Sequence, residues 1–202
     1  LHVFEGASLH LADGTVVLGG HVVVRRGRIE AVGTGVYNSE EPLVRHDLSG
    51  RHVYPAFVDV HSGWGLKRGE RSRWDGQPHY EREDTKAALG WNSALHPEFN
   101  SAESFVPSEK EANEYRSAGF GAVLTHRQDG IVRGSATLVA LSKDAHDAVL
   151  IPNSASWHSF SIGSSPQAYP SSLMGSIALL RQTFCDAEWY GQFEAPEERN
   201  LS

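Results

Sequence analysis

Two histidines follow short apolar segments at positions where a strand would end. His61 comes directly after residues 57–60, and His126 comes directly after residues 121–125. Both runs are typical of buried strands, and imidazole nitrogens are common ligands of zinc. If the strands are parallel, their carboxyl ends lie on one rim, so His61 and His126 are the candidate metal ligands. The alternative for each is a polar turn residue that binds no ligand.

From residue 57 to His126 the sequence predicts a strand, a loop, a helix and a second strand. Residues 62–107 are polar, show no sustained period and predict a long loop or cover. Ser108 and Glu111 have the spacing of a capping box, which predicts a helix from Ser108 to about Ala118 that Gly119 ends. This order is typical of a parallel sheet or a barrel.

The remaining segments predict two more strands and one long helix. Residues 134–141 and 148–151 have the apolar composition of buried strands. A helix is expected over residues 171–189, because apolar side chains recur on one of its faces. This stripe, which we expect to pack on the sheet, consists of Leu173, Ile177, Leu180 and Phe184.

Residues 1–55 predict a small antiparallel β-sandwich. Glycine-containing pairs separate short apolar runs, and glycine allows the positive φ that hairpin turns require. The predicted strands are residues 8–11, 15–18, 21–25, 28–32 and 43–48.

Composition excludes several classes of function. The formal net charge of −7 disfavours nucleic acid and an anionic membrane surface as partners. The single cysteine, Cys185, excludes an intrachain disulfide and a zinc site built from cysteines. We find no apolar run long enough to span a bilayer and no signal peptide. The first residues, 1–7, are also expected to lie within a strand, so any targeting segment would precede Leu1.

The sequence lacks the motifs of other common chemistries. It contains no Gly-x-Ser-x-Gly elbow, no phosphate-binding loop and no His-x-His pair. Asp59 precedes His61 by two residues, so both side chains lie on one side of a strand. We expect Asp59 to be a hydrogen-bond partner rather than a metal ligand, and no residue is assigned a catalytic role.

Two segments resemble the amidohydrolase superfamily. Residues 50–61, G-R-H-V-Y-P-A-F-V-D-V-H, are similar to its first barrel strand, G-K-x-V-x-P-G-F-I-D-x-H-x-H. Residues 27–33, G-R-I-E-A-V-G, resemble the hairpin G-R-I-x-x-V-G that precedes this strand in the family. Residues 119–141 and 169–190 resemble the imidazolonepropionase-like amidohydrolases, which occur as long bacterial chains with two amidohydrolase modules.

The resemblance implies an α/β protein with a β-sandwich. Residues 1–55 would form the sandwich of the composite domain, of the type found in the urease alpha subunit. Residues 56–202 would form the first part of an incomplete (β/α)8 TIM barrel, because a complete barrel takes roughly 250 residues. We therefore expect the chain to be an N-terminal fragment and the first module of a two-module protein.

The resemblance also implies a metal-dependent hydrolase of carbon–nitrogen bonds other than peptide bonds, with zinc as the expected metal. The family places a second histidine two residues after the first, where this chain has Gly63. We therefore expect an incomplete metal site, in which His61 remains and His126 is the replacement ligand. The alternative is a catalytically silent scaffold or regulatory module that packs on an active module.

The resemblance suggests partners and a location as well. The expected partners are the rest of the parent polypeptide, a second amidohydrolase module or another copy of the chain. An exported or periplasmic bacterial protein is favoured over a cytoplasmic one, although the sequence does not determine the location.

Overall fold

The structure is a computed structural model that describes residues 1–67, 92, 94–142, 148–160, 170 and 172–192. The chain forms two compact units, Leu1–Ala56 and Phe57–Ser202. Most of the predicted loop over residues 62–107, including Trp74 and Trp91, lies outside the described residues. Among the described helices, none is both long and apolar enough to cross a membrane.

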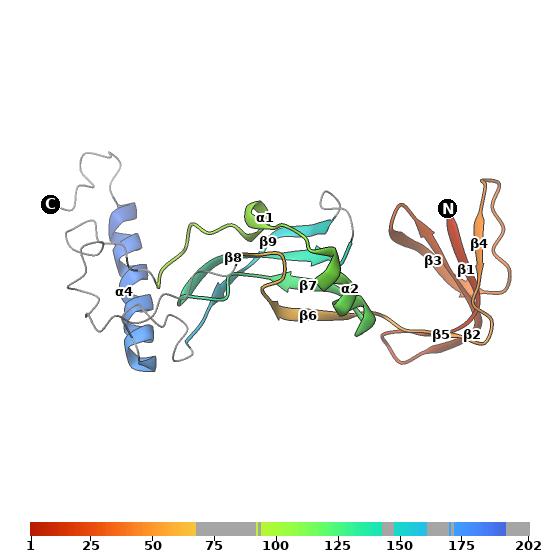
Figure 1. Ribbon diagram of the computed structural model, residues 1–202, viewed down its shortest axis with the longest axis horizontal. Helices are drawn as coiled ribbons and strands as arrows, with labels where there is room; N and C mark the ends of the chain where they lie inside the picture. Colours follow the sequence, from red (N-terminus) through yellow and green to blue (C-terminus); the bar gives the residue numbers. More distant parts are fainter. Residues whose placement is uncertain (68–91, 93, 143–147, 161–169, 171, 193–202) are drawn as a thin grey trace. The chain divides into compact units, whose positions relative to one another are not determined.

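The first unit contains a five-stranded mixed sheet (Figure 1). Strands β1 and β2, and β2 and β3, form antiparallel pairs, while β4 and β5 both run parallel to β1. The expectation of a purely antiparallel arrangement is therefore wrong, because the chain crosses after β3 to the other side of β1. The strands are β1 (His2–His10), β2 (Val16–Arg25), β3 (Arg28–Thr34), β4 (Val44–Asp47) and β5 (His52–Val53).

Strand β2 replaces two strands that the glycine pattern predicted. Gly19 and Gly20 were expected to form a hairpin turn, but they lie within β2. The pairing with β1 shifts register on either side of Ala7, which pairs with Gly20. A β-carbon on Gly20 would lie 2.6 Å from Leu9 Cδ1, so glycine is needed here for close packing at a bulge.

The second unit contains a four-stranded sheet with the order β6-β7-β8-β9 (Figure 1). Strands β6 and β7 are parallel, while β7 and β8, and β8 and β9, form antiparallel pairs. The described elements are β6 (Phe57–Ser62), α1 (Ser101–Ser104), α2 (Glu109–Ser117), β7 (Phe120–Thr125), β8 (Val132–Ala140), β9 (Val149–His158) and α4 (Leu173–Gly191).

The connections explain why only the first two strands of this sheet are parallel. Helix α2 lies in the long connection between β6 and β7, as the predicted βαβ order requires. Only residues 126–131 separate β7 from β8, and only residues 141–148 separate β8 from β9. A parallel crossover needs roughly a dozen residues, so both short connections reverse the chain. The expected succession of parallel barrel strands is therefore wrong beyond β7.

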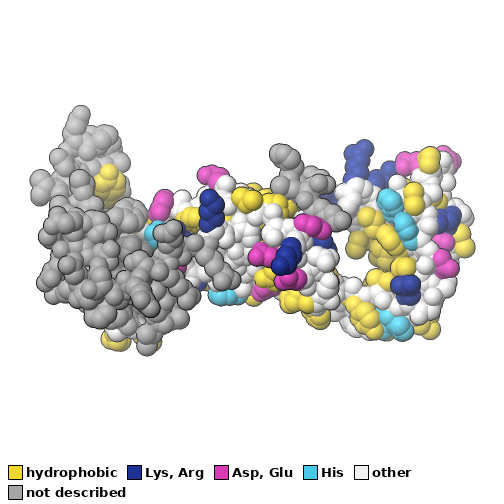
Figure 2. Space-filling view, viewed as in Figure 1, with side chains coloured by type: hydrophobic (Ala, Val, Ile, Leu, Met, Phe, Trp, Pro, Cys, Tyr) yellow, Lys and Arg dark blue, Asp and Glu magenta, His cyan; other side chains and the backbone are white. Residues whose placement is uncertain are grey.

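Strand β6 is exposed, which corrects the expectation of a buried strand. Phe57 is 66% exposed and Val60 is 61% exposed. The cause is its position, since β6 pairs only with β7 among the described strands. Apolar side chains are visible on the surface of this unit (yellow in Figure 2). Its main buried cluster instead comprises Trp64, Ala112, Val123, Val139 and Leu141.

Each of the two longer described helices directly follows a serine N-cap residue, as predicted for α2. Helix α2 ends at Ser117, and Gly119 follows with φ of 92°. However, the Ser108 side chain makes no capping hydrogen bond, so the predicted capping box is not formed. Helix α4 is capped by Ser172, whose hydroxyl oxygen accepts from the Gly175 N–H at 3.1 Å.

The apolar stripe predicted for α4 does not pack as expected. Phe184 is 63% exposed, and Leu173 and Ile177 are exposed as well. Contact with the described part of the unit is made by Leu179, which packs against Ala94 and Ile131. The helical period correctly indicated a helix, but it did not identify the face that this unit buries.

Candidate functional site

The structure brings the two predicted histidines together. The ring centroids of His61 and His126 lie 4.8 Å apart, with an edge-to-face angle of 77°. His61 lies near the end of β6 and His126 directly follows β7, so the parallel pairing of these strands places both on one rim. The backbone N–H of His126 donates to the Ser62 carbonyl oxygen at 2.9 Å, which fixes the two strand ends to each other.

His61 is the solvent-exposed member of the pair. Its backbone N–H donates to Asp59 Oδ1 at 2.9 Å. Asp59 therefore acts as a hydrogen-bond partner close to the site, as expected, and holds the end of β6 rather than the imidazole of His61.

His126 is completely buried and is held in one tautomer. Its Nδ1 atom lies 2.7 Å from the Arg127 carbonyl oxygen, which can only accept a hydrogen bond. Nδ1 must therefore carry the proton, and Nε2 has the free lone pair. Burial lowers the pKa of His126 to about 4, although the Arg127 carbonyl opposes this shift. The imidazole is consequently neutral at pH 7.

Trp157 is the third ring of the site, and sequence reasoning missed it. Its ring stacks on His126 with centroids 4.0 Å apart and planes at 14°, and it meets the edge of His61 at 5.6 Å. The predicted strand stopped at residue 151, whereas β9 continues through Pro152 and Asn153 to His158. Pro152 favoured ending the predicted strand at residue 151, because proline is rare inside strands. The signal that could have been used is Trp157, since a large aromatic side chain next to small polar residues often makes a packing contact.

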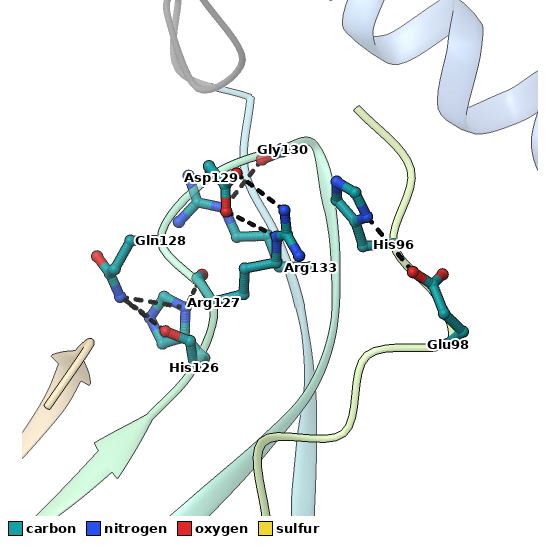
Figure 3. Close-up of polar contacts among 8 residues, drawn as sticks. All are labelled: His96, Glu98, His126, Arg127, Gln128, Asp129, Gly130 and Arg133. Atoms are coloured by element: carbon teal, nitrogen blue, oxygen red, sulfur yellow. Dashed lines mark hydrogen bonds and ion pairs between the residues drawn. The ribbon is translucent and has the colours of Figure 1, made fainter. Parts of the chain in front are cut away.

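Gln128 fills the space beside Gly63. A β-carbon on Gly63 would lie 2.6 Å from Gln128 Cγ. The Gln128 amide nitrogen donates to the His126 carbonyl oxygen at 3.1 Å and lies 3.4 Å from His126 Nε2 (Figure 3). Gln128 therefore occupies the space that a histidine side chain at residue 63 would need.

The segment after His126 carries a compact set of charges (Figure 3). Arg127 and Asp129 form an ion pair with an Nε–Oδ1 distance of 2.6 Å. Arg133 is only 5% exposed, and its Nε donates to the Gly130 carbonyl oxygen at 2.9 Å. Burial lowers the pKa of Arg133, while the charge of Asp129 raises it. The charge of Arg133 also disfavours a proton on His126.

These residues do not fit a complete metal site. The tautomer of His126 is the one that a ligand needs, because Nδ1 is bonded to a carbonyl and Nε2 carries the lone pair, but the Gln128 amide nitrogen lies 3.4 Å from Nε2. However, zinc sites normally use at least three protein ligands. Within residues 1–67, 92, 94–142, 148–160, 170 and 172–192, no three His, Cys, Asp or Glu side chains lie close enough to share an ion. Among the described residues, His61 and His126 are two imidazoles without a third donor.

The chain is similar to a crystal structure of an amidohydrolase from Thermotoga maritima MSB8. The TM-score is 0.65, the sequence identity is 22%, and the match covers 95% of this chain. The two proteins share a fold. The chain spans about half the length of that amidohydrolase, since the match covers 49% of it. No protein-family model and no curated protein matches the chain.

The shared fold agrees with the coarse form of the sequence-based hypothesis. An amidohydrolase-like fold was expected from residues 27–33 and 50–61. The imidazolonepropionase-like subgroup and zinc at His61 and His126 stay predictions, while the expected parallel barrel strands end at β7 within the described residues.

Proposed function

We propose that the chain is the first part of a longer amidohydrolase that cleaves carbon–nitrogen bonds other than peptide bonds. The observation that carries this proposal is the juxtaposition of His61 and His126 at the carboxyl ends of two neighbouring parallel strands. Barrel enzymes place their chemistry at this end of their strands. The fold shared with the Thermotoga maritima amidohydrolase supports the same assignment.

The chain supplies two imidazoles with different properties to this site. His126 is neutral at pH 7, with a lone pair on Nε2, so it can accept a hydrogen bond there. His61 is exposed and is the first of the two that a substrate would meet. Trp157 shields His126 from water on one face and holds the ring in place.

The metal that amidohydrolases use would need donors beyond these two side chains. His61 and His126 provide two nitrogens at most, and Gln128 fills the space next to Gly63. We therefore propose that the remaining donors come from other parts of the longer protein. The chain on its own would then be inactive.

The test compares the longer protein with its His61→Ala variant. Hydrolysis of a panel of lactams, hydantoins and dipeptides is measured alongside zinc, iron and manganese content. A loss of activity of at least about 100-fold in His61→Ala, with full activity in the matched control His158→Ala, would support the proposal. Hydrolysis of none of these substrates by the unaltered longer protein would count against it.

A second candidate function is favoured by the packing around Gly63. Gln128 closes this position, and Trp157 covers His126, which is the arrangement of a packed interior rather than an open ligand site. We therefore keep as the alternative a silent scaffold that packs on a second amidohydrolase module or on another copy of the chain. In that case His61→Ala would leave hydrolysis by the longer protein unchanged.

A further inference from the structure

Arg133 is a buried arginine that forms no ion pair with the described residues. It is the second residue of β8, and it is 5% exposed. Its Nε donates to the Gly130 carbonyl oxygen at 2.9 Å, and Arg133 makes no other hydrogen bond or ion pair within the part of the chain that the structure describes. The N–H groups of both Nη nitrogens therefore lack an acceptor there.

The turn before β8 fixes the position of Arg133. Gly130 has φ of 84°, and a β-carbon there would lie 3.1 Å from the Ala94 carbonyl oxygen, so the turn needs glycine. The N–H groups of Ile131 and Val132 both donate to that same carbonyl oxygen, at 2.8 and 3.0 Å. The Gly130 carbonyl, which accepts from Arg133, is thereby held in place. The guanidinium is a fixed donor rather than a mobile surface group.

The charges around Arg133 leave one positive charge uncompensated. Both carboxylate oxygens of Asp129 are already bonded to Arg127, at 2.6 Å from its Nε and 3.0 Å from its Nη2. His126, which directly precedes Arg127, is neutral at pH 7. Burial lowers the pKa of Arg133 and the charge of Asp129 opposes this shift, but a guanidinium stays protonated at pH 7. The two arginines therefore face a single carboxylate.

A buried charge without a partner is unfavourable, and here it indicates a ligand of opposite charge. Removing a guanidinium from water costs free energy, which an anion with two acceptor oxygens recovers. Neither Nη atom of Arg133 is completely buried, so an oxygen of a small anion can reach them from solvent. A carboxylate matches the planar fork and the single excess charge, whereas a phosphate group carries more than one negative charge at pH 7.

Arg133 lies at the same end of the sheet as the candidate site. Strand β8 runs antiparallel to β7, so the start of β8 lies beyond the end of β7, where His126 follows. Arg127 and Arg133 both lie on the segment that leads from His126 into β8 (Figure 3). The charge of Arg133 disfavours a proton on His126, which requires the two side chains to be near each other.

We propose that Arg133 binds the carboxylate of a substrate that is hydrolysed at His61 and His126. This inference rests on the proposed function, and it narrows the substrates to amides, lactams or hydantoins that carry a free carboxylate group. A carboxylate can also come from an aspartate or glutamate side chain of the longer protein, in which case Arg133 would form a structural ion pair. The experiment separates these two sources.

The first measurement is binding to the 202-residue chain, which needs no catalysis. N-acetylglycine supplies a carboxylate, and N-acetylglycinamide is its neutral counterpart. Ligand-observed NMR should show saturable binding of the acid and none of the amide. Arg133→Met should abolish this binding, and Arg133→Lys, which keeps the charge but loses the fork, should weaken it about 10-fold. Arg181→Met, which removes an exposed arginine of α4, is the control and should leave binding unchanged.

The second measurement is the preference of the longer protein for an acidic substrate. The values of kcat/KM are compared for hydantoin-5-acetic acid and hydantoin-5-acetamide, which differ only in the carboxylate. The ratio of acid to amide should exceed one, should fall by about 10- to 100-fold in Arg133→Met and should stay unchanged in Arg181→Met. Comparing two substrates within one variant removes any general loss of activity or of folded protein.

The two measurements test different parts of the proposal. Equal binding of N-acetylglycine by the unaltered chain and a folded Arg133→Met variant would overturn the carboxylate site. Arg133-dependent binding by the chain, with an unchanged substrate ratio in the longer protein, would assign Arg133 to a side chain of that protein and overturn the substrate role. Hydrolysis of no substrate at all would contradict the proposed function and the substrate role together, while Arg133-dependent binding would still support the carboxylate site.

Discussion

The Cγ atom of Gln128 lies 2.6 Å from the position that a β-carbon on Gly63 would take. This distance is well inside van der Waals contact, so a side chain at residue 63 and the present conformation of Gln128 exclude each other. The same glutamine donates a hydrogen bond to the carbonyl of His126. Residue 63 and the candidate site are therefore coupled through one side chain.

This coupling predicts the effect of adding a side chain at residue 63. Gly63→Ala should destabilise the chain by roughly 1–3 kcal/mol, because Gln128 must leave its place. The additional Gln128→Ala substitution should recover part of this loss, which a double-mutant cycle in urea would measure. Gly191→Ala is the control, since a β-carbon there meets nothing within 4 Å. Fully additive effects of the two substitutions would contradict the contact.

The buried His126 predicts that stability falls in mild acid. Its pKa is lowered from 6.5 to about 4 in the folded chain, so the unfolded chain binds the proton first as the pH decreases. Stability is therefore complete above about pH 6.5 and declines between about pH 6.5 and pH 4, by at most about 3 kcal/mol. Unfolding in urea at several pH values measures this slope. In the His126→Asn variant the slope over this window should become smaller.

The stack of Trp157 on His126 predicts a linked effect on stability and protonation. Trp157→Ala should destabilise the chain by roughly 1–3 kcal/mol, because Trp157 is only partly buried. Loss of the covering ring should also raise the pKa of His126 towards 6.5, because water then reaches the imidazole. Proton NMR of the histidine ring signals would follow the titration. Trp157→Phe should change the pKa much less, and an unchanged pKa in Trp157→Ala would contradict the shielding.

The hydrogen bonds of Ser62 predict that removing its hydroxyl destabilises the end of β6. Its buried hydroxyl oxygen accepts from the Trp64 N–H at 3.0 Å and lies 3.1 Å from the Tyr115 hydroxyl. Ser62→Ala leaves the buried Trp64 N–H without this partner and should destabilise the chain by roughly 1–3 kcal/mol. Ser117→Ala, at an exposed hydroxyl near the end of α2, is the control and should change stability by less than about 0.5 kcal/mol. Equal effects of both substitutions would argue against the role of Ser62.

Local patterns predicted the elements of the candidate site better than their surroundings. The apolar run before His126 and the serine at the start of α2 correctly indicated β7 and the helix before it. The proximity of His61 and His126 followed from the parallel pairing that a strand, helix and strand produce. These features depend on short segments and on one well-understood connection.

Several features that depend on how the segments pack in space were not predicted. The exposure of β6 follows from its place at the edge of the described sheet, which its apolar composition does not reveal. The reversal between β7 and β8 could have been inferred from the short connection at residues 126–131, but their apolar composition suits either direction. Trp157 reaches His126 only because β9 continues past Pro152. Gln128 beside Gly63 is likewise a tertiary contact without a local signal.

The most direct test is the metal content of the 202-residue chain and its His61→Ala variant after saturation with zinc and dialysis. Our account assigns only two donors, His61 and His126, to the candidate site. It therefore predicts the same number of zinc equivalents in both proteins. The loss of one tightly bound equivalent in a folded His61→Ala variant would contradict it, because that result would require a complete metal site within this chain.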